Sequence, residues 1–196
     1  MKRLSDIVLA LILGLVFLPV MTVTAVMVLV SLGRPLLFLQ RRAGCGGATF
    51  ALFKWRSMND VTDADGRPLP DEERVTRIGR MIRRLRIDEL PSVLNILRGE
   101  LSFVGPRPLP ATSPINQARG QARLAVRPGL TGLAQVSGNT LLSDEEKLAV
   151  DLHYIRAHTP VGDLAIIWQT LVTVIGGEKR NEPLIRRALD EMEKPA

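Results

Sequence analysis

Apolar residues are concentrated at the N-terminus of the chain. No residue between Ile7 and Gly33 is charged, and this stretch is longer than the ~20 apolar residues that cross the hydrocarbon core of a bilayer. Pro19 lies near its middle, where a proline removes one backbone hydrogen bond and kinks or breaks a helix. The pattern predicts a membrane-embedded helix, broken at Pro19, within a first region of residues 1–35.

Positive charges flank this segment on both sides. Lys2 and Arg3 precede it, and Arg34, Arg41 and Arg42 follow it. Because cationic flanks tend to remain on the cytoplasmic side, they favour a re-entrant helix hairpin that enters and leaves through the same leaflet. A kinked but ordinary span is the alternative that the sequence leaves open.

Short extended pieces follow the apolar segment. Residues 36–39 and 50–53 are apolar and read as strands that are joined by a turn at Gly44–Gly47. Residues 59–73 are rich in Asp, Gly and Pro, and they predict a polar loop.

Helical periodicity then recurs along the chain. Residues 76–85 carry one apolar stripe among arginines, typical of a helix on anionic lipid headgroups and equally of a solvated surface helix. A second amphipathic pattern spans 164–175, where Trp168 indicates contact with the membrane interface. Ser143 and Glu146 form a capping-box pattern at the start of another helix.

These elements predict a mainly α protein with short β pieces, an α+β fold. Its parts are the membrane region 1–35, a compact domain over 36–177 that includes amphipathic interfacial helices, and a charged tail over 178–196. The tail contains a short helical pattern at 184–192.

Composition narrows the classes of partner. The net charge of +6 indicates an anionic partner, which charge alone does not distinguish among nucleic acid, anionic lipid and a phosphorylated substrate. The single cysteine, Cys45, excludes an internal disulfide framework. His153 and His158 lack metal-ligand spacing, so we expect both to be structural or surface residues.

Two adjacent carboxylates are the first candidates for chemistry. Asp88 and Glu89 stand between a run of arginines and an apolar periodicity that Gly99 ends. Asp88 is expected to be the N-cap of this helix, with Pro91 in its first turn. A helix end would keep Asp88 ionised and oriented, as a nucleophile or metal ligand requires, although a helix cap with an ordinary first-turn acid explains the local pattern as well.

Three cations are candidates to accompany these carboxylates. Arg107 lies between two prolines in Gly105-Pro106-Arg107-Pro108, and Arg127 precedes a second loop rich in proline and glycine. Such stiff loops present a fixed guanidinium to phosphate. Lys54 follows the second strand piece. Each of the three is also a candidate to pair with a structural acid instead.

Several motifs occur in a defined order along the chain: Lys2-Arg3-x-x-Asp6, the proline-broken membrane segment, Phe53-Lys54-Trp55-Arg56-Ser57-Met58, Arg77-Ile78-Gly79-Arg80, Asp88-Glu89-Leu90-Pro91, Gly105-Pro106-Arg107-Pro108 and Arg127-Pro128-Gly129-Leu130-Thr131-Gly132. Together they resemble a known family, the bacterial sugar transferases, and more specifically the small monotopic polyprenol-phosphate phosphoglycosyl transferases. The resemblance extends from Met1 to about Gly177.

The resemblance implies transfer of a phosphosugar from a nucleoside diphosphate sugar, a UDP-sugar by expectation, to polyprenol (undecaprenyl) phosphate, with release of nucleoside monophosphate. It implies that Asp88 is the nucleophile of a covalent intermediate and that Glu89 assists through Mg²⁺ or proton handling. Both carboxylates are expected at the metal. The expected substrate-binding residues are Lys54, Arg56, Arg107, Pro108 and Arg127.

The same resemblance implies a cytoplasmic catalytic domain at the bacterial inner membrane, in contact with phospholipids and without a nucleic-acid partner. The reaction would be the first membrane step of a surface glycan or glycoprotein pathway. Formation of a homo-oligomer is left open. Leu18 departs from the small polar residue that the family commonly has before the breaking proline, so Thr22 or nearby backbone must stabilise the break.

Because the chain begins at the family core, we expect the minimal form of the family. The competing hypothesis from another class is a membrane-anchored basic protein that binds nucleic acid or anionic lipid through its arginines without catalysis.

Overall fold

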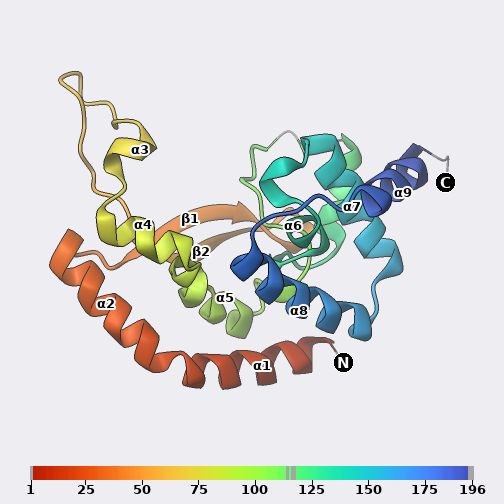
Figure 1. Ribbon diagram of the computed structural model, residues 1–196, viewed down its shortest axis with the longest axis horizontal. Coiled ribbons are helices and arrows are strands. Elements are labelled where there is room, and N and C mark those ends of the chain that lie inside the picture. The colour runs from red at the N-terminus through yellow and green to blue at the C-terminus, as the bar shows by residue number, and fades with distance from the viewer. Residues whose placement is uncertain (1, 114, 116–117, 194–196) are drawn as a thin grey trace.

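Helices dominate the computed structural model, which describes residues 2–113, 115 and 118–193, and its strands are short (Figure 1). This confirms the α+β prediction. The helices are α1 (Lys2–Val16), α2 (Leu18–Leu32), α3 (Asp71–Arg74), α4 (Arg77–Arg84), α5 (Val93–Arg98), α6 (Leu133–Val136), α7 (Asp144–Ala157), α8 (Pro160–Gly176) and α9 (Glu182–Glu193). The strands are β1 (Leu37–Ala43), β2 (Thr49–Trp55), β3 (Ser102–Val104) and β4 (Gly129–Thr131). The 3₁₀ turns are η1 (Cys45–Gly47), η2 (Ile87–Ser92), η4 (Ala118–Ala125) and η5 (Asn139–Leu141).

The apolar N-terminal segment forms two helices, α1 and α2, with a bend of 62° between them. Pro19 lies in the first turn of α2, directly after the break at Phe17. The Thr22 hydroxyl donates a hydrogen bond of 2.9 Å to the Leu18 carbonyl, one turn earlier in α2 and beside Pro19; stabilisation of the break by Thr22 stays a prediction. None of the described helices is by itself long and apolar enough to cross a membrane, whereas the bent pair meets that test by length and composition.

Both ends of the bent pair are attached to the rest of the protein. At its start, Arg3 donates to the carbonyls of Ile96 and Leu97 in the last turn of α5, where helix carbonyls have fewer backbone partners. At its end, Arg56 donates to the Leu32 carbonyl, at 3.2 Å. Figure 1 shows the remaining elements on one side of the pair. Both ends of the bent pair are therefore attached to the same body of the protein.

Lys2 and Asp6 also fasten α1 to the body. The Lys2 ammonium lies 2.6 Å from Asp163 at the start of α8 and 2.8 Å from the Tyr154 hydroxyl. The buried Asp6 carboxylate accepts hydrogen bonds from the Ser102 hydroxyl and the Phe103 amide. The basic start of the chain therefore makes specific structural contacts. The sequence pattern had indicated only that its charges flank the apolar segment.

The predicted strand pieces form an antiparallel hairpin, β1 with β2, whose register runs from Leu37 opposite Trp55 to Ala43 opposite Thr49. The tight connection is η1, as the glycines predicted. A second, parallel pair joins β3 to β4. The main core lies between these strands and α5, where Ile96, Leu101 and Val104 are almost completely buried.

The helices after β4 build the other side of the body. The Ser143–Glu146 capping box is present at the start of α7, as predicted. The predicted 184–192 helix is also present as the longer α9, which packs on α7 through the buried Ile185 and Ala188. The predicted 178–196 tail is therefore partly a packed helix, and its last three residues lie outside the described residues.

We expect both ends of the bent pair to be protected from an outside-only thiol reagent in intact cells, because both are attached to the same body. The test uses single cysteines at the exposed positions Ser5→Cys and Leu39→Cys. Both are placed in a Cys45→Ser background, because native Cys45 is exposed. Permeabilised cells, in which both sites should react, are the control. Labelling of one end alone in intact cells would establish an ordinary span.

Candidate functional site

Asp88 and Glu89 lie in the short turn η2, which the hairpin holds in place. The Ser92 hydroxyl at the end of η2 donates to the Phe53 carbonyl of β2 at 2.9 Å. The buried Asn95 side chain accepts from the Phe53 amide and donates to the Ala51 carbonyl. These bonds attach η2 and α5 to β2 and so bring the carboxylates next to the strand that carries Lys54.

The prediction of Asp88 as a helix N-cap is wrong. Asp88 lies inside η2, whose preceding residue is Arg86 in the left-handed conformation (φ 57°), and the α-helix itself begins only at Val93. Pro91 explains the difference, since it lacks an amide hydrogen and disfavours an α conformation at the residue before it. The predicted end of the helix at Gly99 is confirmed (φ 84°).

Two cations converge on Glu89. The Lys54 ammonium lies 2.7 Å from Glu89 Oε1, and both side chains are only 15% exposed. Arg107 Nη2 approaches the same oxygen at 3.4 Å. Pro108 lines the small hollow beside this group. Lys54, Arg107, Pro108 and the carboxylate pair, which were predicted separately, are therefore brought together by the fold.

Arg42 also lies beside Lys54 and Glu89, although the sequence pattern indicated for it only a place among the charges that follow the apolar segment. It lines the hollow together with Lys54 and Glu89. Burial lowers the pKa of Arg42, as does neighbouring Arg107, while Glu89 opposes both effects. Side chains alternate between the faces of a strand, and the hairpin register places Arg42 on the Lys54 face. That alternation was the signal available in the sequence.

Arg56 and Arg127 lie elsewhere in the structure. Arg56 pairs with Asp60 at 2.5 Å and contacts the end of α2. Arg127 Nε donates to the Gly99 carbonyl at 3.0 Å. Arg127 lines a separate cavity of about 330 Å³, whose other walls include Lys2 and Tyr154.

The two carboxylates have opposite electrostatic environments. Burial raises the pKa of Asp88, and the charge of Glu89 raises it further, against the weaker effects of nearby cations. Burial alone would also raise the pKa of Glu89, but Arg107 and Lys54 outweigh it and hold that pKa below its usual range. The expected helix end that would keep Asp88 ionised is absent, and the closest cations serve Glu89 instead.

The donor set fits a hard divalent ion in one respect. Asp88 Oδ1 is buried and has no hydrogen-bond partner among the described residues, and carboxylate oxygens are the preferred ligands of Mg²⁺. No group of three or more His, Cys, Asp or Glu side chains suited to a metal ion occurs within residues 2–113, 115 and 118–193. Asp88 and Glu89 alone resemble the carboxylates of sites in which one or two such groups share Mg²⁺ with substrate phosphates and water.

The hollow beside Glu89 is small. Its volume is about 10 Å³, roughly the space of one water molecule. Lys54 and Arg107 occupy the adjoining space through their contacts with Glu89. An anionic ligand at this hollow meets both cations, and phosphate oxygens are suitable acceptors for their N–H groups, in competition with Glu89.

Known proteins similar to this chain were found by comparison. A family described as bacterial sugar transferase matches residues 1–177. The uncharacterized sugar transferase EpsL of Bacillus subtilis is 40% identical over 179 residues, which cover 91% of this chain and 89% of that protein.

Two further relatives have more specific names. The UDP-glucose:undecaprenyl-phosphate glucose-1-phosphate transferase of Caulobacter vibrioides is 39% identical over 89% of this chain and 69% of that protein. The UDP-N-acetylgalactosamine-undecaprenyl-phosphate N-acetylgalactosaminephosphotransferase of Aeromonas hydrophila is 37% identical over 90% of this chain. The chain spans 44% of the length of the Aeromonas protein.

We expect Lys54→Met to raise the pKa of Glu89, because the ammonium at 2.7 Å is one of the groups that hold it down against burial. Carboxyl NMR titration of ¹³C-labelled protein in detergent measures this change. Lys147→Met, which removes a cation paired with exposed Asp144, is the matched control and should leave Glu89 unchanged. An unaltered Glu89 titration in Lys54→Met would show that Lys54 does not stabilise the ionised carboxylate.

Proposed function

The chain belongs to the bacterial sugar transferase family, and on this premise we propose that it transfers a phosphosugar from a nucleoside diphosphate sugar to polyprenol phosphate. The observation that carries the proposal is the partly buried Asp88–Glu89 pair with Lys54 and Arg107 at its edge. Relatives named for UDP-sugars and undecaprenyl phosphate support these substrate classes. Because those relatives differ in their sugar, the sugar itself is left to experiment.

In the proposed first step, Asp88 is the nucleophile. A carboxylate oxygen attacks the phosphorus that bears the sugar, and the bond from that phosphorus to the bridging oxygen breaks. The electron pair leaves with the nucleoside monophosphate, and an aspartyl phosphosugar remains on the protein. The Asp88 oxygen without a hydrogen-bond partner supports this role, since no contact within the described residues has to be given up before attack.

In the second step, an oxygen of polyprenol phosphate attacks the same phosphorus. The carboxylate of Asp88 leaves, which regenerates the protein and yields a polyprenol diphosphate sugar. Donor and acceptor therefore react in separate half-reactions, and ping-pong kinetics are expected. Because Asp88 reacts first with the donor and then with the acceptor, a single reaction centre serves both transfers.

Charge compensation is the main task of the surrounding residues. Both substrates are anionic and must approach an anionic carboxylate, so cations are needed to screen the repulsion and the charge of the transferring phosphoryl group. Lys54 and Arg107 supply this positive charge when they exchange their contacts with Glu89 for contacts with phosphate oxygens. Arg42 is a third cation at the same hollow.

Asp88 and Glu89 are proposed to hold Mg²⁺ together with the substrate diphosphate. When bound, the ion supplies further neutralisation of the phosphate charge. Glu89 then has two duties, since its ionised form also holds Lys54 and Arg107 before the substrate arrives.

The bent α1–α2 pair is proposed to lie in the cytoplasmic leaflet of the bacterial inner membrane, with the catalytic body on the cytoplasmic face. Exposed apolar side chains along α1 and α8, among them Leu11 and Trp168, would contact phospholipids. This placement holds the site at the level of lipid headgroups, where the phosphate of the polyprenol acceptor lies. The soluble nucleotide sugar approaches from the opposite side.

Purified protein in lipid nanodiscs is expected to release nucleoside monophosphate from at least one nucleotide sugar when polyprenol phosphate and Mg²⁺ are present. A panel that varies the sugar and the base tests activity and reports the donor at the same time. Chelation of Mg²⁺ should abolish the release. If no member of a broad panel is turned over, the alternative of a basic lipid- or nucleic-acid-binding protein becomes the better account.

Asp88→Asn should lower turnover by about 10³-fold or more, because the amide is no nucleophile. With donor sugar and no acceptor, intact-protein mass spectrometry should detect a phosphosugar adduct on the wild-type protein and none on this variant. Asp65→Asn alters an exposed loop carboxylate and is the control that should retain the adduct. An adduct that persists in Asp88→Asn would place the nucleophile on another residue.

A further inference from the structure

The loop that carries Arg107 is held through its backbone carbonyls. Prolines at 106 and 108 have no amide hydrogen, so their contribution to backbone hydrogen bonding is limited to accepting. The Gly129 amide of β4 donates to the Pro106 carbonyl at 2.9 Å. The Ala43 amide of β1 donates to the Leu109 carbonyl at 2.9 Å. Two different strands thus fix the two sides of Arg107.

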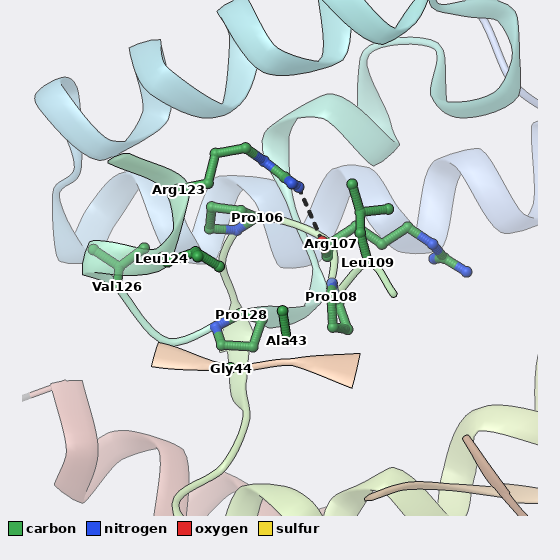
Figure 2. Close-up of a pocket in the computed structure, with 10 residues that line it drawn as sticks. All are labelled: Ala43, Gly44, Pro106, Arg107, Pro108, Leu109, Arg123, Leu124, Val126 and Pro128. Carbon is green, nitrogen blue, oxygen red and sulfur yellow. Dashed lines mark hydrogen bonds between the residues drawn. The ribbon is translucent and has the colours of Figure 1, made fainter. Parts of the chain in front are cut away.

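The carbonyl of Arg107 itself accepts from a side chain. Arg123 Nη2, from η4, donates to this oxygen at 3.0 Å. Figure 2 shows the bond, with the Arg107 side chain extending away from Arg123 on the other side of the loop. The backbone of Arg107 is therefore held from one side while its guanidinium reaches Glu89 at 3.4 Å.

The Arg123 side chain is itself held firmly. Its Nε donates to Asp151 Oδ2 of α7 at 2.8 Å, and the two side chains are only 4% and 3% exposed. A buried ion pair of this kind is weak evidence for a stabilising role, since desolvation of both charges offsets most of their attraction. Burial raises the pKa of Asp151 to about 6, partly opposed by Arg123. A geometric role is the better explanation for retaining such a pair beside the Arg107 loop.

We propose that Arg123, held by Asp151, is a positioning residue that sets the direction in which Arg107 leaves its loop and so places the Arg107 guanidinium against Glu89. A planar guanidinium suits this task, because it donates to the carboxylate and to the carbonyl at the same time in fixed directions. A small rotation at the Arg107 carbonyl is amplified at the far end of its long side chain. Misplacement of a catalytic group by about 1 Å costs up to about 10²-fold in rate.

The first test is a double-mutant cycle, and it rests on the proposed function. Arg123→Lys keeps the charge beside Asp151 but lacks the rigid, planar set of donors that directs one N–H to each acceptor. It should lower kcat by about 10- to 100-fold, with a smaller change in the KM for the donor sugar. In an Arg107→Ala background the same substitution should change kcat less than about twofold, because the residue through which it acts is gone. Equal losses in both backgrounds would overturn the proposal.

A matched control on α7, the helix that carries Asp151, separates positioning from general damage. Arg156 of α7 donates to the Glu191 carbonyl of α9 at 3.0 Å, so Arg156→Lys makes the same chemical change away from the loop. It should leave kcat unaltered. Thermal unfolding of all variants should show that the Arg123→Lys protein remains folded at the assay temperature. If the Arg123→Lys protein does not remain folded, Asp151→Asn is used in its place, because this variant keeps Arg123 but holds its side chain less firmly.

The second test needs no activity. In ¹⁵N NMR spectra of arginine side chains, the Arg107 signal is identified by its loss in Arg107→Lys. In the wild type this signal should lie away from the position of solvated arginines. In Arg123→Lys it should move to the position of solvated arginines, and in Arg156→Lys it should stay. An unchanged Arg107 signal in Arg123→Lys would overturn the positioning role. If the wild type turns over no donor sugar, the proposed function fails, and this spectrum still decides the role of Arg123.

Discussion

Two neighbouring carboxylates that are largely removed from water have to be compensated by positive charge, and this requirement governs the structure around Asp88 and Glu89. Lys54 and Arg107 meet it at Glu89, at 2.7 and 3.4 Å. The effect on the pair is asymmetric, because the cations lower the pKa of Glu89 while burial and the charge of Glu89 raise that of Asp88. Adjacent groups of the same chemistry are thereby distinguished by their surroundings, which is how proteins assign different tasks to paired acids.

The fold supplies these cations from segments that are far apart in the sequence. Lys54 comes from β2, and the same strand receives the hydrogen bonds of Ser92 and Asn95 that hold the carboxylate turn. Arg107 comes from a loop whose carbonyls are fixed by β1, β4 and Arg123. The hydrogen bonds that hold the Arg107 loop matter as much as the contact between Arg107 and Glu89, because the position of a long side chain depends on the backbone that carries it.

The bent α1–α2 pair is connected to this site by direct contacts. Arg3 binds the carbonyls at the end of α5, the helix that continues from the carboxylate turn, and Asp6 accepts bonds from the strand that precedes the Arg107 loop. These contacts fix the bent pair and the site relative to each other. Lys2 and Arg3 take part in this connection, so the cationic start of the chain has a structural role within the protein itself.

The sequence by itself determined the elements whose causes are local. The break at Pro19, the hairpin turn at Gly44–Gly47, the end of α5 at Gly99 and the capping box at Ser143 follow from backbone restrictions or from contacts within a few residues. The tertiary structure decided which charges meet: it joined Arg107 and Lys54 to Glu89, added Arg42, and placed Arg56 and Arg127 elsewhere. The 3₁₀ turn at Asp88 is not such a case, because Pro91 is a local cause that the expected helix cap did not take into account. The physical reason is range, since a dihedral preference acts on one residue whereas an ion pair depends on how distant segments pack.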